Sequence, residues 1–442
     1  MLNYIWLALV VLSVAIGGWN DRLKDVTDGA FDGAKTAVTI AFGLIGVMAL
    51  WLGVMRLAER AGLIQKIARA LQPLMRRLFP DVPRDHPAMG SMVMNMAANM
   101  LGLGNAATPL GLRAMKDLET LNPRPGVATN AMCTFLAINT ASVQLIPTTA
   151  IALLVAAGSK RPTAIVGTAL LATLCAATVA ITTVKLLEKL PFFRLPVGRD
   201  SVEPQAPQSV VRPAAEPEPS VALPKKLWAT PILVGLGLFF AALFARMVFP
   251  ALCGFAVDPN VPAQNGFVRS VNALSLLAIP FLLSFFPIYA ATRGIKVYDE
   301  FVEGAKEGFG VILKIIPFLV TMLVAISMFK GAGGIDLVTR ALTPILAPLH
   351  FPPDLLPLAL MRPLSGSGTL AILMDIVHRL GPDNIVALMA ATIYGSTETT
   401  FYVAAVYFGS VGVTQTRHAI PAGLLADLAG VIASVILCRA VL

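Results

Sequence analysis

The chain of 442 residues is 56% hydrophobic and only 13% charged, and its mean hydropathy is +0.76. A soluble protein carries roughly a quarter charged residues, whereas the uncharged runs here reach about 20 residues, enough to cross about 30 Å of hydrocarbon. These features exclude a soluble globular fold and predict an all-α, polytopic integral membrane protein. The net charge of +9 fits Lys and Arg in cytoplasmic loops, and no basic patch with interleaved aromatic residues indicates nucleic-acid binding.

Cysteine and histidine spacing gives no indication of a disulfide framework, a metal site or a cofactor. The cysteines lie far apart in apolar runs, and the histidines lie in loops or at the ends of runs: Cys133, Cys175, Cys253, Cys438, His86, His350, His378 and His418. The first apolar run, residues 2–19, lacks a basic n-region and a small-residue cleavage site. We therefore expect a retained helix there, not a signal peptide.

The first half alternates plain spans with interrupted apolar segments. In chain order it contains a span over 2–19, a charged segment over 20–35, a span over 36–57, a basic segment over 56–85, interrupted segments over 87–118 and 126–158, and a span over 163–183. Apolar and basic positions lie on opposite helix faces in 56–85, which predicts an amphipathic helix on the cytoplasmic membrane surface, broken at Pro73. Segment 20–35 would then face outward.

A proline-rich linker divides the chain. Residues 191–224 contain eight prolines among polar residues, a composition typical of an extended, disordered linker. We predict one domain over 1–190, the linker over 191–227 and a second domain over 228–442. The second half contains spans over 229–248, 271–291 and 309–329, an amphipathic segment over 335–348, interrupted segments over 357–376 and 385–411, and a closing span over 420–442.

The two halves resemble each other in sequence. The matching segments are 31–35 with 302–306, 69–73 with 340–344, 102–104 with 366–368, and 139–142 with 396–399. Segments interrupted by Gly or Pro at matching places in two halves are typical of a transporter's binding site. The charge bias of the loops favours inverted repeats, each with broken helices or re-entrant hairpins.

The most informative interruption is residues 393–400, which place five hydroxyl side chains, a glycine and Glu398 inside an apolar run. A carboxylate at mid-bilayer costs about 3 kcal/mol on insertion scales unless it is protonated, paired or hydrated. A helix broken around a polar cavity explains this composition, because its free backbone groups and hydroxyls can hold a solute.

Four motifs resemble the spore maturation proteins. Residues 94–109 (MNMAANMLGLGNAATP) and 134–140 (TFLAINT) are similar to spore maturation protein A, and residues 362–368 (RPLSGSG) and 394–402 (YGSTETTFY) are similar to spore maturation protein B. The resemblance covers nearly everything except the linker and suggests a fusion of the two. It implies the nucleoside-recognition or Gate superfamily, with concentrative nucleoside transporters and the ferrous-iron permease, hence paired gate repeats and alternating access. It also implies a link with spore core dehydration.

Arg362 and Glu398 are the sharpest candidate pair, because neither charge is tolerable alone in hydrocarbon. They form either a structural salt bridge between two broken helices or a working pair. In the working pair, Arg362 binds an anionic group and Glu398 takes a proton or orders the gate. The matching places in the first half are neutral: Asn139, Ser142 and Gln144.

Two further groups also have structural alternatives. Asn95 and Asn99 share one helix face and either bind solute beside a chain break or act as interhelical hydrogen-bond partners. Ser365, Ser367 and Thr369 flank glycines and either cradle an anion or cap a helix-breaking turn. Lys314, Asp375 and Asp427 are interpreted mainly as structural partners. The loose dinucleotide fingerprint from Gly102 has no preceding strand and is set aside.

The favoured hypothesis is a transporter or flippase for a small polar solute, neutral or anionic, in the bacterial cytoplasmic (inner) membrane. A non-transporting receptor or scaffold is the alternative; an intramembrane hydrolase is disfavoured because no hydrolase motif is present. The expected partners are the lipid bilayer, an unidentified solute, a coupling proton or cation, and a second copy in a homo-oligomer. The candidate solute-binding residues are Asn95, Asn99, Asn105, Asn139, Ser142, Gln144, Arg362, Ser365, Ser367, Thr369, Ser396, Thr397, Glu398 and Thr399.

Overall fold

The structure, a computed structural model, describes residues 2–102, 104–193, 228–250, 266–334 and 351–442, together with Leu337 and Arg340. This part of the chain is all-α, as predicted, and its only strand-like feature is an isolated bridge between Val127 and Gln415. The predicted linker beyond Phe193 and most of the amphipathic segment 335–348 lie outside the described residues.

The first half folds into helices that follow the predicted order. They are α1 (Leu2–Trp19), α2 (Leu23–Arg60), α3 (Leu63–Leu78), α4 (Pro87–Met100), α5 (Gly104–Glu119), α6 (Asn130–Ala141), α7 (Thr148–Ala156), α8 (Ile165–Leu187) and the 3-10 turn η1 (Pro191–Phe193). Both interrupted segments break where their Gly, Asn and Pro residues lie. Segment 87–118 becomes the hairpin of α4 and α5, with Gly102 at φ +74 in its turn.

The structure differs from the predictions for this half at two places. The predicted span over 36–57 is part of a longer helix, because α2 begins at Leu23 inside the charged segment 20–35 and runs unbroken to Arg60. Pro73 does not break α3. Proline removes one backbone hydrogen bond from a helix, but the apolar face of α3 is held by packing, since Ile64, Ala68 and Met75 are buried.

The second half repeats this pattern after an additional helix. Its elements are α9 (Ala229–Val248), α10 (Gly266–Thr292), α11 (Val297–Gly331), the 3-10 turn η4 (Pro353–Leu355), α13 (Leu356–Met361), α14 (Gly366–Leu380), α15 (Ile385–Ser396), α16 (Thr400–Gly409) and α17 (Ala419–Val441). Segment 357–376 breaks at residues 362–365 and segment 385–411 breaks at residues 397–399, as predicted.

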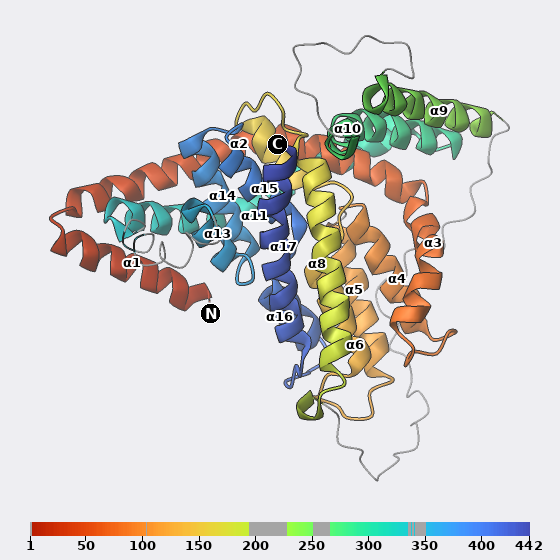
Figure 1. Ribbon diagram of the computed structural model, residues 1–442, viewed down its shortest axis with the longest axis horizontal. Coiled ribbons are helices and arrows are strands. Elements are labelled where there is room, and N and C mark those ends of the chain that lie inside the picture. Colours follow the sequence, from red (N-terminus) through yellow and green to blue (C-terminus); the bar gives the residue numbers. More distant parts are fainter. Residues whose placement is uncertain are drawn as a thin grey trace.

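In the part of the chain that the structure describes, five helices are long and apolar enough to cross a membrane: α2, α8, α9, α10 and α17. The chain is therefore a multi-pass membrane protein. Figure 1 shows α8 and α17 side by side along one direction, whereas α9 and α10 pair with each other and run across it. Among the five, α9 is the least buried by the rest of the chain.

Helices α2 and α11 pack along each other through glycines. A Cβ added at Gly33 would lie 2.7 Å from the carbonyl oxygen of Leu323, and one added at Gly304 would lie 2.6 Å from that of Leu52. Each member of the first pair lies 271 residues from its counterpart in the second, so the two contacts are equivalent under the sequence repeat. An approximate two-fold axis therefore relates antiparallel α2 and α11.

The closing spans α8 and α17 are also antiparallel. Arg417, just before α17, donates to the carbonyl of Phe193, just after α8, and Gly430 lies against Ala176 near the middle of both helices. Equivalent spans that run in opposite directions are the arrangement of an inverted repeat. This geometry brings the broken helix of each half against the closing span of the other, since α6 contacts α17 and α15 contacts α8.

Candidate functional site

The first broken helix is stabilised by hydroxyl groups at its interruption. Helix α6 ends at Ala141, and Ser142 takes the left-handed conformation (φ +40). The chain then runs irregularly to Thr148. The Thr173 hydroxyl of α8 donates to the carbonyl oxygens of Ala141 (2.8 Å) and Ser142 (3.1 Å), so two carbonyls released by the break remain hydrogen-bonded inside the protein.

The second break crosses the first. Helix α15 ends at Ser396, Thr397 is extended, and α16 begins at Thr400. The backbone N–H of Glu398 donates to the carbonyl oxygen of Thr140 at 2.7 Å. The irregular segments of the two halves are therefore in direct contact.

A polar cavity of about 50 Å³ lies at this crossing. It is lined by Gln144, Pro147, Thr149 and Ala150 from the first break, Arg362 from the turn between α13 and α14, and Tyr394, Gly395 and Glu398 from the second break. A single water needs about 10–15 Å³ by this kind of measure, so the cavity holds a few waters. Typical solute pockets are about 300 Å³ or more, so a nucleoside-sized solute fits only after the helices separate.

Arg362 is a buried cation in the wall of this cavity, with 2% of its surface exposed. Its Nη2 donates to the Tyr394 carbonyl at 3.0 Å, and its guanidinium carbon lies 4.9 Å from the centre of the Tyr394 ring. Its Nε forms no hydrogen bond. No ion pair within 4.0 Å joins Arg362 to Glu398, so the structural salt bridge is not formed, although both residues line one cavity.

The asparagines of the first half form a network beside the cavity. Asn99 Nδ2 donates to Asn139 Oδ1 at 2.8 Å, and Asn95 Nδ2 donates to the Ala107 carbonyl at 2.8 Å. The Tyr407 hydroxyl of α16 lies 3.4 Å from Asn139 Oδ1 and 3.3 Å from Asn95 Nδ2. These contacts match the interhelical alternative and tie the first hairpin to the second half.

The hydroxyls around Gly366 cap a helix. Ser365 Oγ accepts from the Gly368 N–H at 3.0 Å and lies 3.3 Å from Ser367 Oγ, while Thr369 Oγ1 donates to the Ser365 carbonyl at 2.6 Å. Ser365 is thus the N-cap of α14. This arrangement fits the local-turn alternative.

The other predicted residues lie around the breaks but do not line the cavity. Ser142 Oγ accepts from Gln144 Nε2 (3.4 Å), and Ser396 Oγ donates to the Ile393 carbonyl (3.0 Å). Thr397 lies against Gly430, and Thr399 lies against Gly366. The side chains of Asn105 and Lys314 lie outside the described residues. Of the fourteen candidates, Gln144, Arg362 and Glu398 line the polar cavity.

Four residues at the crossing are not among the fourteen candidates: Thr140, Tyr394, Thr400 and Tyr407. Tyr394 and Thr400 belong to the interruption at 393–400, so a signal for them was present. Asp427, interpreted mainly as a structural partner, is a buried carboxylate of α17 that accepts a hydrogen bond from Thr400 Oγ1 at 2.6 Å. An acidic residue inside a membrane span marks a functional position by default.

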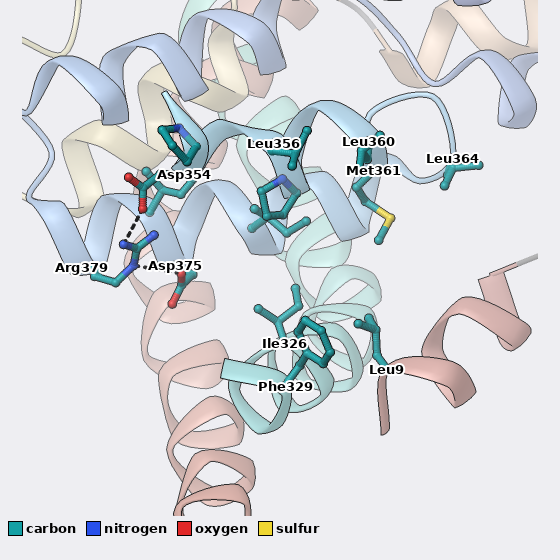
Figure 2. A pocket seen from close by; sticks show the side chains of 14 residues that line it. Leu9, Ile326, Phe329, Asp354, Leu356, Leu360, Met361, Leu364, Asp375 and Arg379 are labelled. Carbon is teal, nitrogen blue, oxygen red and sulfur yellow. Dashed lines mark hydrogen bonds and ion pairs between the residues drawn. The ribbon is translucent and has the colours of Figure 1, made fainter. Parts of the chain in front are cut away.

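A second, mostly apolar cavity of about 310 Å³ lies between α1, α11, α13 and α14 (Figure 2). Arg379 sits at one end between Asp354 (2.7 Å) and Asp375 (3.5 Å), and Lys330 also approaches Asp375 at 3.6 Å. The charged residues of this cavity pair with one another, and none of the fourteen candidate residues lines it, so it is not the predicted site.

Comparison with known proteins agrees with the two-repeat geometry. A family model described as nucleoside recognition (Gate) matches residues 41–158 and 312–414, which together make up half of the chain. The chain belongs to the Gate family. It is 49% identical to spore maturation protein A of Bacillus subtilis (strain 168) over 174 residues, which cover 39% of this chain and 89% of the relative. It is 42% identical to spore maturation protein B of the same strain over 167 residues, or 38% and 94%.

These matches fit a fusion of one sequence of each kind. The two Gate regions include every residue that lines the polar cavity, one group from each region. Helices α8 and α17 lie beyond both regions. The chain is therefore a membrane protein of nucleoside-recognition type whose candidate site lies between its two Gate regions.

Proposed function

We propose that this Gate protein carries a small polar, anionic solute across the bacterial cytoplasmic membrane by alternating access, and that it binds its solute without chemical conversion. One observation carries the proposal. The buried guanidinium of Arg362 has no carboxylate partner among the described residues, and it lines a polar cavity where the broken helices of two inverted repeats cross. A buried charge without an oppositely charged partner strongly destabilises a protein. An anion bound beside Arg362 would therefore offset the free-energy cost of burying its guanidinium.

The geometry also supports movement. Each half contributes one wall of the cavity, so a tilt of one half against the other opens it toward one side of the membrane. In this structure the two broken segments pack closely where they cross, and the cavity between them has a volume of only about 50 Å³. A closed site between the two halves is what alternating access requires of an intermediate state.

The test is a thermal-unfolding screen of the purified chain in detergent against nucleosides, nucleotides, amino acids, dicarboxylates and lipid phosphates. A ligand at a hundred times its Kd stabilises a protein by about 2.7 kcal/mol. We expect an anionic compound to raise the unfolding midpoint, Arg362→Ala to abolish the rise, and Glu398→Gln to reduce it.

Arg379→Ala is the matched control, because it removes a guanidinium that already has two carboxylate partners in the apolar cavity. This variant should keep the response to the ligand. A hit that survives Arg362→Ala would place the solute elsewhere. A hit that binds but is not taken up by proteoliposomes would favour the receptor or scaffold function.

A further inference from the structure

Asp427 is a buried acidic residue that does not line the polar cavity. It lies on α17 with 2% of its surface exposed, and its Oδ2 accepts from Thr400 Oγ1 at 2.6 Å. Its Oδ1 forms no hydrogen bond, and no described Lys, Arg or His lies within ion-pair distance of it. An ionised carboxylate in hydrocarbon needs compensation.

Two further threonine hydroxyls approach the same face of α17. Thr140 Oγ1 and Thr397 Oγ1 are buried and form no hydrogen bond of normal geometry, although the Thr397 side chain faces Asp427. Glycines flank Asp427 on the same face of α17 and admit these groups. A Cβ at Gly423 would lie 3.3 Å from Thr140 Oγ1 and 3.0 Å from Thr400 Oγ1, and a Cβ at Gly430 would lie 2.6 Å from Thr397 Cγ2.

The local field favours a positive charge beside the carboxylate. Helices α6 and α15 both end at the crossing, and helix C-termini carry partial negative charge. Thr400 begins α16, and a helix N-terminus stabilises the ionised form of a nearby carboxylate. In broken-helix transporters, unwound backbone carbonyls and half-helix C-termini coordinate the coupling Na⁺ or H⁺. The hydroxyls and the carboxylate here would add further oxygen ligands.

We propose that Asp427, Thr140, Thr397 and Thr400 form a binding site for Na⁺ between α17 and the two crossing breaks. Its role as the coupling ion rests on the transport function proposed above, whereas the site itself does not. Arg362 and Glu398 both act electrostatically on Asp427. An anion that neutralises Arg362 removes repulsion from the bound cation, so cation and anion strengthen each other's binding by the same factor.

The test is thermal unfolding of the purified full chain during a titration with NaCl, with choline chloride holding the ionic strength constant. We expect a saturable rise in the unfolding midpoint with Na⁺ and none with choline. Asp427→Asn should abolish it, and Thr140→Val or Thr397→Val should raise the half-saturating Na⁺ concentration at least tenfold. Asp375→Asn, which removes a carboxylate with its own cationic partners, should leave it unchanged.

A Na⁺ response that persists in Asp427→Asn would overturn the site. The site would also be overturned if Na⁺ did not stabilise the wild type and Asp427→Asn removed a pH dependence of the unfolding midpoint. Asp427 would then bind a proton and not Na⁺. If Asp427→Asn does not fold, Thr140→Val and Thr397→Val provide the test, because both keep the carboxylate. An unchanged half-saturating Na⁺ concentration in both variants would then overturn the site. If a solute stabilises the protein but Na⁺ does not, only the Na⁺ site is overturned. If Na⁺ stabilises the protein but no solute binds or is taken up, only the proposed transport is overturned.

Discussion

Tyr407 shows at the residue scale how the halves are joined. Its hydroxyl lies within hydrogen-bond distance of Asn95 Nδ2 and Asn139 Oδ1, while its ring stacks on Phe135 with centroids 5.7 Å apart. The aromatic contact supplies packing and the hydroxyl joins the asparagine network. Both ties connect α16 of the second half to helices of the first.

Tyr407→Phe should keep the stacking and lose the hydroxyl contacts. Because Asn139 Oδ1 still accepts from Asn99, we expect a modest loss of about 1 kcal/mol of stability, measured as a lower unfolding midpoint in detergent. Combining it with Asn99→Ala should cost more than the sum of the two single changes, since both act on one acceptor. Strict additivity would show that the network does not exist as described.

His418 gives the molecule a predicted pH dependence. It immediately precedes α17, and both of its ring nitrogens are buried without a hydrogen bond. Burial, with contributions from Arg417 and Lys185, lowers its pKa from 6.5 to about 4. His418 is therefore protonated near pH 6.5 in the unfolded chain but only near pH 4 in the folded chain. Because the unfolded state binds more protons between these values, the stability of the folded state falls as the pH drops from 6.5 to 4.

His418→Phe should remove that contribution while keeping an aromatic ring against Phe193, whose centroid lies 5.7 Å away. We expect the variant's unfolding midpoint to fall less than the wild type's between pH 6.5 and 4. Parallel curves over that interval would contradict the assignment.

At the element scale, the glycines of α2 and α11 set how closely these helices approach. Gly29 and Gly33 are spaced four apart, as are Gly304 and Gly308, and each lies against the backbone of the other helix. Small residues at this spacing let membrane helices pack closely. Sequence analysis used Gly33 and Gly304 only as markers of the repeat, although their spacing with the neighbouring glycines was visible.

Gly33→Ala and Gly304→Ala should each destabilise the protein by about 1–3 kcal/mol, because the new methyl would overpack the interface. Gly46 on α2 and Gly310 on α11 have open space at the same position. Alanine there should be neutral or stabilise by up to about 1 kcal/mol through helix propensity. Comparing the four unfolding midpoints checks the pattern, and equal effects at all four positions would argue against the antiparallel interface.

Most elements could be predicted because apolar run length and Gly or Pro interruptions act locally. The breaks at 142–147, 362–365 and 397–399 follow from such local signals. The unbroken start of α2 and the continuity of α3 through Pro73 could not be predicted, since long-range packing stabilises both. Tertiary contacts override local preference in these segments.

At the scale of the whole molecule, the repeat and the polar cavity at its broken segments could be predicted, while the detailed contacts could not. Equivalent motifs indicated two related halves, and the structure pairs their helices antiparallel. The contact between Glu398 and Thr140, or the position of Asp427 behind the crossing, depends on how distant helices pack. Charge alone suggested that Arg362 and Glu398 pair directly, and the structure instead places them in the wall of one small cavity.

The most direct test of the central claim measures access to the cavity from each side of the membrane. Gln144→Cys would be made in a chain lacking Cys133, Cys175, Cys253 and Cys438, and treated with a membrane-impermeant thiol reagent in right-side-out and inside-out vesicles. Ala152→Cys, buried on α7 and not part of the cavity, is the control. Alternating access predicts that Gln144→Cys reacts in both preparations and Ala152→Cys in neither. Reaction of Gln144→Cys from one face only, or from neither, would contradict the account.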